Sequence, residues 1–290
     1  MELTGVFVPM ITPFDACGAV AFDALERLAH EVLDAGATGL VALGTTGEPS
    51  ALTAGERDGV VAVLSRVCAA HAAPLLGPPD ERVSAALTLV PPFVRPGPRG
   101  VLAHFTALAA TSPVPLVIYH VPPRTGQPLD AVTLRRIGAL DRVIGIKYAT
   151  GALDADVIAL LADPPPGFAV LSGDDLFLSP LLALGAAGGI LASAHLATDR
   201  FAALTRAWQT GDLDAARKLG HELTPLSAAL FAEPNPTVIK AVLHARGRIP
   251  TPSVRLPLLS ATAASRDAAL RCLGAAGRRS SPGAPGSAGR

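Results

Sequence analysis

The sequence predicts an α/β fold, a (β/α)8 TIM barrel followed by a C-terminal helical appendage. Short β-rich runs alternate with Ala- and Leu-rich helical patterns, which is the arrangement that produces parallel sheets. The β-rich runs are almost continuously apolar, as expected for strands covered on both faces. A chain of 290 residues, half of them apolar, is long enough for one such barrel and its core.

Eight candidate strands precede a purely helical region, and eight strands with helices between them can close a barrel. The candidate strands are Val6–Ile11, Gly39–Leu43, Pro74–Leu76, Ala86–Val90, Pro115–Tyr119, Val143–Lys147, Phe168–Leu171 and Gly189–Ala192. Helix starts are indicated by possible capping boxes at Asp23–Glu26 and Thr53–Glu56, and by possible N-caps at Asp130 and Asp154.

The connection between the third and fourth candidate strands is unusually short. Only Gly77–Ala85 is available, and it contains Pro78, Pro79 and Asp80. A parallel crossover that includes a helix needs about 10–12 residues or more. The third crossover helix is therefore expected to be short or missing, unless one of the two strand assignments is wrong.

Three regions are expected along the chain. Residues 1–197 form the barrel, residues 198–273 form the last barrel helix and the appendage, and residues 274–290 form a disordered tail rich in Gly, Ser, Pro and Arg. The helices expected in the second region are Thr198–Gln209, Asp212–Phe231, Thr237–Ala245 and Ala261–Leu273.

Composition excludes several classes of protein. The formal net charge is zero, so no electrostatic attraction to nucleic acid or to an anionic membrane is expected. Neither a signal peptide nor a membrane span is evident. The three cysteines, Cys17, Cys68 and Cys272, form neither a disulfide framework nor a metal-ligand pattern, which favours a reducing cytoplasm.

The Asp174-Asp175 pair has no further ligand at metal spacing, so no metal is expected and N-capping of the next helix is the preferred interpretation.

Lys147 is the leading candidate for chemistry, because barrel enzymes place their function at the carboxyl ends of the strands. It ends the apolar run Val-Ile-Gly-Ile and is one of only three lysines in an arginine-rich chain, with Lys218 and Lys240. Such a bias suggests a GC-rich genome, in which a retained lysine is more often needed as an amine. Desolvation disfavours the ammonium form, and a free amine can attack a ketone to form an imine. The alternative is a surface lysine that extends from a strand end into water.

Neighbouring strand ends supply possible partners for Lys147. Tyr119 could move protons as a general acid and base, or it could be a core tyrosine. The Gly44–Gly47 turn, with Thr45 and Thr46, could bind a carboxylate through backbone N–H groups and hydroxyls, or could be an ordinary loop. Arg124 could bind a second carboxylate, or could be a solvated surface arginine.

Together these segments resemble the dihydrodipicolinate synthase / N-acetylneuraminate lyase family of class I aldolase-type barrels, from about Leu3 to Leu273. The order and spacing of the matching segments are specific, although no single segment is decisive. The segments are Val8–Phe14, Gly44–Glu48, Tyr119–Pro122, Gly145–Lys147 and Leu171–Asp175.

The resemblance implies a role for each candidate residue. Lys147 would form the imine with C2 of pyruvate, Thr45 would relay protons to Tyr119, and Thr46 would hold the pyruvate carboxylate. The covalent imine would make a separate cofactor unnecessary. Two further positions, Gly173 and Ile190, match residues that line the same pocket.

Arg124 favours the synthase branch of the family, because it matches the arginine that binds the carboxylate of L-aspartate-4-semialdehyde. The implied reaction condenses this aldehyde with pyruvate to 4-hydroxy-tetrahydrodipicolinate, for lysine and diaminopimelate synthesis. A homotetramer or homodimer is implied. Two alternatives stay open: an aldolase or dehydratase for another 2-keto acid, and a degenerate barrel that binds a keto acid with little catalysis.

The chain departs from the family pattern in several places. Phe93 stands where the synthases carry a tyrosine that completes a proton relay across a subunit interface. His120 and Tyr148 replace an asparagine and a glutamate of the pattern. The residues that bind the inhibitor lysine in some relatives would lie in the missing third helix, so no inhibition through that site is expected.

Overall fold

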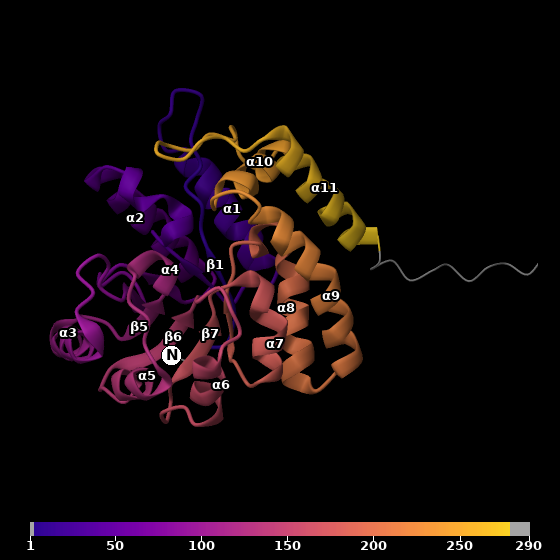
Figure 1. The fold of residues 1–290 in the computed structure, drawn as a ribbon. Coiled ribbons are helices and arrows are strands. Elements are labelled where there is room, and N and C mark those ends of the chain that lie inside the picture. Colours follow the sequence, from indigo (N-terminus) through magenta and orange to yellow (C-terminus); the bar gives the residue numbers. More distant parts are fainter. Residues whose placement is uncertain (1–2, 279–290) are drawn as a thin grey trace, which may run out of the picture.

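The computed structural model describes residues 3–278 and consists of a closed barrel of eight parallel strands with helices around it (Figure 1). The barrel predicted from the sequence is confirmed, and every predicted strand overlaps an observed one. The strands are β1 (Gly5–Pro9), β2 (Gly39–Val41), β3 (Leu75–Gly77), β4 (Ala85–Leu89), β5 (Leu116–His120), β6 (Val143–Tyr148), β7 (Ala169–Ser172) and β8 (Gly188–Ile190).

Helices follow most of the strands and cover the outside of the barrel. Three short 3-10 helices, η1 (Thr45–Gly47), η2 (Pro49–Ala51) and η3 (Asp175–Phe177), lie in the loops after β2 and β7. The α-helices are α1 (Phe22–Asp34), α2 (Ala54–Ala70), α3 (Gly97–Thr111), α4 (Pro122–Thr125), α5 (Ala131–Gly138), α6 (Ala155–Ala162), α7 (Leu178–Ala183), α8 (Ala194–Thr210), α9 (Leu213–Leu230), α10 (Thr237–Ala245) and α11 (Ala263–Arg278).

The barrel interior is packed with apolar side chains and is not a pore. Side chains alternate between the inside and the outside along each strand, so a second apolar layer lies between the strands and the surrounding helices. The buried residues of the interior are Leu3, Phe7, Val41, Leu76, Ala85, Val117, Leu171 and Ile190.

The third crossover helix is missing, as the short connection predicts. Residues 78–84 join β3 to β4 without a helix, yet the two strands pair in register, with Leu76 opposite Ala85 and Gly77 opposite Ala86. Both strand assignments are therefore correct. The connection is held by Asp80, whose carboxylate accepts a hydrogen bond from the backbone N–H of Arg82 at 2.9 Å.

Three of the four predicted helix starts are confirmed. Thr53 and Glu56 form a reciprocal capping box, and the side chains of Asp130 and Asp154 accept N-cap hydrogen bonds. The capping box predicted at Asp23 is wrong.

Helix α1 begins one residue before Asp23, with Ala21 in the N-cap position and no side-chain cap. Asp23 lies inside the first turn, where its negative charge still favours the helix N-terminus. The local sequence pattern therefore predicts the position of the first helical turn correctly, but not the residue at which the helix begins.

The appendage consists of α9, α10 and α11, and α8 connects it to the barrel. In Figure 1, α10 and α11 lie at the upper end of the molecule, away from the marked N-terminus. Helix α8 begins at Ala194, but its backbone is non-helical at Ala197, so the part of the helix after this kink begins at residue 198, as predicted. Helix α11 continues past Gly274, where the sequence predicts a tail, as far as Arg278; residues 279–290 lie outside the described residues. No helix within residues 3–278 is long and apolar enough to span a membrane.

Candidate active site

Lys147 and Tyr119 lie side by side at the carboxyl ends of β6 and β5. The strand register places the two residues opposite each other, and Lys147 is also opposite Leu171 of the interior cluster. The Lys147 side chain is buried, with 7% exposure, and its Nζ lies 4.4 Å from the centroid of the Tyr119 ring. The amine and the phenol therefore face one space above the packed barrel core.

Tyr119 also contacts the turn after β2. Its hydroxyl lies 3.4 Å from Oγ1 of Thr45. Burial by itself raises the pKa of Tyr119, but the positive charges of Lys147 and Arg124 and the hydrogen bond with Thr45 outweigh it, so the pKa lies below its ordinary value. A lowered pKa makes it easier for the phenol to give up its proton to a neighbour.

The turn that carries Thr45 and Thr46 is fixed from several sides. Thr12 Oγ1 donates a hydrogen bond to the carbonyl of Gly47 at 2.8 Å. Asn235, from the segment before α10, donates from Nδ2 to Oγ1 of Thr46 at 2.8 Å. The appendage therefore takes part in the site, although it follows the last barrel strand in the sequence.

Lys240 of α10 holds the same turn through a buried ion pair. Its Nζ lies 2.8 Å from Oε1 of Glu48 and donates to the carbonyl of Thr12 at 2.9 Å. The ammonium also lies 4.1 Å from the centroid of the Phe14 ring. The second carboxylate oxygen of Glu48 accepts a hydrogen bond from the backbone N–H of Arg255 at 2.9 Å. Burial lowers the pKa of Lys240 to about 8, against the opposing attraction of Glu48.

All seven site residues predicted from the sequence line one small cavity of about 70 Å³. The structure thus brings them together, while their roles remain predictions. Asn235 and Phe231 of the appendage and the carboxylates after β7 line the same cavity. The seven residues are Thr45, Thr46, Tyr119, Arg124, Lys147, Gly173 and Ile190.

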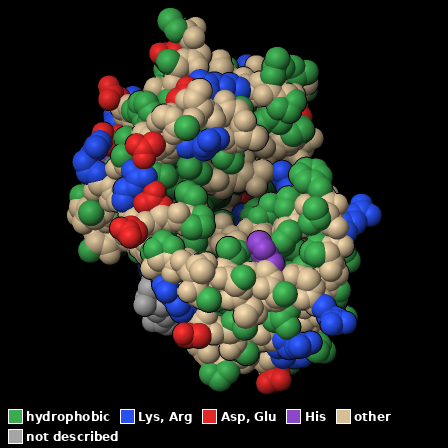
Figure 2. Space-filling view, turned by 90° about the vertical axis from the view of Figure 1, so that its left-hand side faces the viewer, with side chains coloured by type: hydrophobic (Ala, Val, Ile, Leu, Met, Phe, Trp, Pro, Cys, Tyr) green, Lys and Arg blue, Asp and Glu red, His purple; other side chains and the backbone are tan. Residues whose placement is uncertain are grey.

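A larger cavity of about 510 Å³ adjoins the small one and has mostly apolar walls. Thr45, Tyr119, Arg124 and Asn235 line both cavities. The larger one extends past the segment that joins β3 to β4 and past residues 255–258. Figure 2 shows that the face on the left of Figure 1 is hollowed across its middle, with hydrophobic side chains gathered along the hollow.

Asp174 stands at the N-cap position of η3, but neither its side chain nor that of Asp175 makes a capping hydrogen bond there, so the capping interpretation was wrong. Asp174 accepts a hydrogen bond from the backbone N–H of Gly151 at 2.7 Å, and Asp175 accepts one from that of Ser193 at 2.6 Å. Burial raises the pKa of Asp175 to about 6. Within residues 3–278, no group of three or more His, Cys, Asp or Glu side chains is arranged to hold a metal ion.

His120 and Tyr148, the two departures at the ends of β5 and β6, are absent from the lining of either cavity. They pack together, with ring centroids 5.5 Å apart, and Tyr148 belongs to the apolar layer outside the barrel. The hydroxyl of Tyr148 donates to Asp154 at 2.7 Å. Burial lowers the pKa of His120 to about 4, so this histidine is neutral near pH 7.

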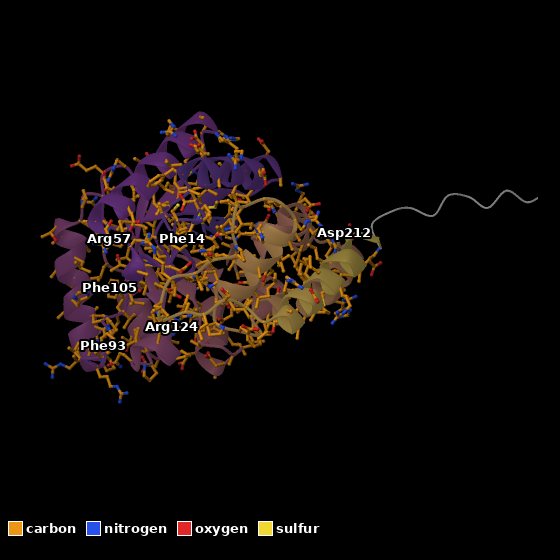
Figure 3. The ribbon with its side chains drawn as sticks, turned by 90° about the horizontal axis from the view of Figure 1, so that it is seen from above. Phe14, Arg57, Phe93, Phe105, Arg124 and Asp212 are labelled. Atoms are coloured by element: carbon orange, nitrogen blue, oxygen red, sulfur yellow. The ribbon has the colours of Figure 1, made fainter. Side chains whose placement is uncertain are left out.

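Phe93 lies outside both cavities of its own chain. Its side chain is 89% exposed, and its φ of 67° is in the left-handed region that a bulky residue rarely occupies. Figure 3 shows Phe93 at the edge of the molecule and Arg124 nearer the middle. Phe93 therefore combines an exposed aromatic side chain with a strained backbone.

Comparison with known proteins matches residues 2–77 and 80–276 to the Dihydrodipicolinate synthetase family. The chain belongs to this family. It is 39% identical over 180 residues to the 4-hydroxy-tetrahydrodipicolinate synthase of Moorella thermoacetica, covering 62% of the chain and 61% of the relative. It is also 39% identical over 193 residues to that of Synechococcus elongatus, covering 66% of the chain and 64% of the relative. These matches therefore span less than two thirds of the relatives' length.

Solved structures match over almost their full length. The dihydrodipicolinate synthase of Thermotoga maritima superposes with a TM-score of 0.90 at 28% identity, covering 96% of this chain and 99% of that one. A chloride-inhibited dihydrodipicolinate synthase of Acinetobacter baumannii, complexed with pyruvate, superposes with a TM-score of 0.88 at 31% identity, covering 95% and 99%. This chain thus shares its barrel and its appendage with these two structures.

The buried Lys240–Glu48 pair predicts a large loss of stability when one partner is removed. Lys240→Met leaves the Glu48 carboxylate without its counter-ion, and removal of one partner of a buried pair costs about 3–5 kcal/mol of the free energy of unfolding. Urea unfolding followed by circular dichroism measures this. The exposed Lys218→Met serves as the matched control, and equal midpoints for the two variants would contradict the prediction.

Proposed function

We propose that the protein condenses pyruvate with L-aspartate-4-semialdehyde to 4-hydroxy-tetrahydrodipicolinate, a step towards lysine and diaminopimelate. The observation that carries this proposal is the buried amine of Lys147 beside the phenol of Tyr119, in a cavity that Thr45 and Arg124 also line. The names of the similar proteins support the same reaction.

In the first half of the reaction, Nζ of Lys147 attacks C2 of pyruvate and forms a carbinolamine. Loss of water from the carbinolamine gives the imine, and Tyr119 with Thr45 moves the protons that these steps require. The imine withdraws electrons from C3, so that a proton leaves C3 and a nucleophilic enamine forms. The chemistry uses the protein's own amine and calls for no separate cofactor.

In the second half, C3 of the enamine attacks the aldehyde carbon of the semialdehyde, and a C–C bond forms. The amino group of the semialdehyde then attacks the imine carbon and displaces Lys147, which closes the ring and frees the enzyme. Each step is a proton transfer, an addition or an elimination, so no oxidant or reductant is consumed.

The carboxylates of the two substrates need separate binding positions. Thr46 and the neighbouring backbone N–H groups suit the pyruvate carboxylate beside Lys147. Arg124 lines both cavities and suits the carboxylate of the aldehyde, which would enter through the larger one. Gly173 and Ile190 complete the small cavity, and glycine leaves room beside Lys147, since a Cβ at position 173 would lie 2.9 Å from Cγ of Lys147.

We further propose that the protein works as a homodimer or homotetramer in the cytoplasm. Phe93 and Val94 are 89% and 73% exposed, and a second copy that covers them would remove two large apolar side chains from water. By the family resemblance, Phe93 would then lie near a neighbouring subunit's site, at the position of the relay tyrosine.

A second candidate function keeps the imine chemistry but takes another 2-keto acid or another aldehyde. Phe93 is the observation that favours it, because a phenylalanine cannot pass a proton along a relay. A barrel that binds keto acids with little turnover is the extreme case of this alternative.

Reduction with borohydride in the presence of pyruvate is expected to attach pyruvate covalently to Lys147. Intact-mass measurement and peptide mapping detect the adduct. Lys147→Arg should abolish it, because the guanidinium stays protonated and cannot form an imine, whereas the exposed Lys218→Arg should leave it unchanged. Wild-type protein that gives no adduct would exclude both enzymatic functions.

Arg124→Ala is expected to weaken binding of the semialdehyde but not of pyruvate. Loss of a charge-assisted hydrogen bond of about 1.5–3 kcal/mol predicts a rise in KM for the semialdehyde of about 10- to 150-fold. Steady-state kinetics with both substrates measures the two KM values, and the exposed Arg99→Ala is the control. A variant with unchanged KM for the semialdehyde would favour another second substrate.

Phe93→Tyr tests whether the missing hydroxyl limits turnover. We expect kcat to rise by about 10²-fold, the lower end of what a positioned acid-base group contributes. Phe93→Leu, which adds no hydroxyl, is the control and should give no gain. If kcat of the tyrosine variant stayed at the wild-type value, Phe93 would have no part in a relay.

A further inference from the structure

Asn235 is the only asparagine in the 290 residues of the chain. It lies in the appendage two residues before the start of α10, and it lines both the small and the large cavity. In a chain whose composition so strongly disfavours asparagine, a single amide in the wall of the site indicates a need for that group. The sequence alone predicts no role for Asn235.

The amide fixes the hydrogen-bond direction of the Thr46 hydroxyl. Nδ2 of Asn235 donates to Oγ1 of Thr46 at 2.8 Å, and this uses one of the two lone pairs of that oxygen. The hydroxyl has a single proton, which must then point away from Asn235. No acceptor for it is found among residues 3–278, and Thr46, 3% exposed, lines the small cavity beside Lys147. The free proton is therefore available to a group bound in that cavity.

The backbone on both sides of Asn235 is held in place. The carbonyl of Pro234 accepts hydrogen bonds from the backbone N–H and the hydroxyl of Thr237, at 3.0 and 2.6 Å. One turn later, Lys240 of the same helix is bound to Glu48. Because α10 is anchored to the turn that carries Thr46, the amide and the hydroxyl keep a fixed relation.

The Oδ1 atom of Asn235 is buried and has no hydrogen-bond partner. If the amide were turned the other way, Oδ1 would accept the Thr46 proton, and the hydroxyl could no longer donate to a ligand. The observed direction therefore keeps Thr46 as a donor, and donors are what an anionic ligand requires.

We propose that Asn235 is a positioning residue that directs the Thr46 hydroxyl proton towards the carboxylate of the bound 2-keto acid. The proposal rests on the proposed function, since it concerns how pyruvate is bound before and during imine formation. Part of the selectivity for 2-keto acids would then come from Asn235, a residue outside the barrel strands.

The substitution Asn235→Asp tests the proposal with almost no change of shape. An ionised aspartate only accepts hydrogen bonds, so it takes the Thr46 proton and removes the donor from the carboxylate. The pyruvate concentration that half-saturates trapping at Lys147 by cyanoborohydride should rise at least about 10-fold, the effect of one charge-assisted hydrogen bond. The maximal trapped fraction should stay near that of the wild type, because Lys147 is untouched.

A change of pH separates this role from a merely structural one. A protonated aspartic acid can donate its O–H to Thr46 and so reproduce the arrangement of the amide. An aspartate buried beside an anionic ligand has a raised pKa, so the defect of Asn235→Asp should shrink as the pH falls. The wild type should not show this recovery.

Two further variants complete the test. Gln209→Glu is a matched control, because the Gln209 amide also donates to a threonine, Thr4, at 2.9 Å, but on an exposed surface at the other end of the barrel. It should trap pyruvate like the wild type. In a Thr46→Val background, which has no hydroxyl to direct, Asn235→Asp should change half-saturation by less than about twofold.

The outcomes separate a failure of the proposed function from a failure of the role of Asn235. Wild-type protein that traps no pyruvate contradicts the proposed function, and the role of Asn235 falls with it. A wild-type adduct with an unchanged half-saturating concentration in Asn235→Asp overturns only the role of Asn235. A defect that persists in the Thr46→Val background would show direct repulsion of the ligand and would also overturn positioning through Thr46.

Discussion

Lys240 and Glu48 form an ion pair that is almost completely removed from water, and the candidate site depends on it. Two buried charges are costly unless their hydrogen-bonding capacity is used. Here the ammonium reaches a carboxylate, a carbonyl and an aromatic ring, while both carboxylate oxygens accept hydrogen bonds. The pair therefore satisfies both charges and at the same time fixes the position of the turn that carries Thr45 and Thr46.

The barrel alone does not build this site. Its strands supply the amine and the phenol, since the parallel register puts Lys147 opposite Tyr119. The turn that faces them is held by α10, which contributes both a cation and, just before its first residue, an amide. A helical appendage of this kind serves as a structural part of the pocket as well as a cover for apolar surface.

Much of the fold could be predicted because its signals are local. Apolar runs identified all eight strands, and their ends pointed to Lys147 and Tyr119, with the family resemblance supplying the roles. The contacts of Asn235 and Lys240 join residues 189 and 192 positions apart in the sequence. Periodicity carries no information about such pairs, and the rarity of lysine and asparagine was the only sequence signal. The aspartates after β7 were misread for the same reason, since their partners lie in other loops.

The late position of α10 has a consequence for synthesis of the protein. The ribosome makes chains from the N-terminus, so the turn at Thr45 and Thr46 emerges long before Asn235 and Lys240 exist. A nascent chain that already contains Lys147 still lacks the two contacts that hold this turn. Assembly of the pocket is thereby tied to the synthesis of α10, and a chain released before α10 would contain Lys147 without the contacts that hold the turn at Thr45 and Thr46.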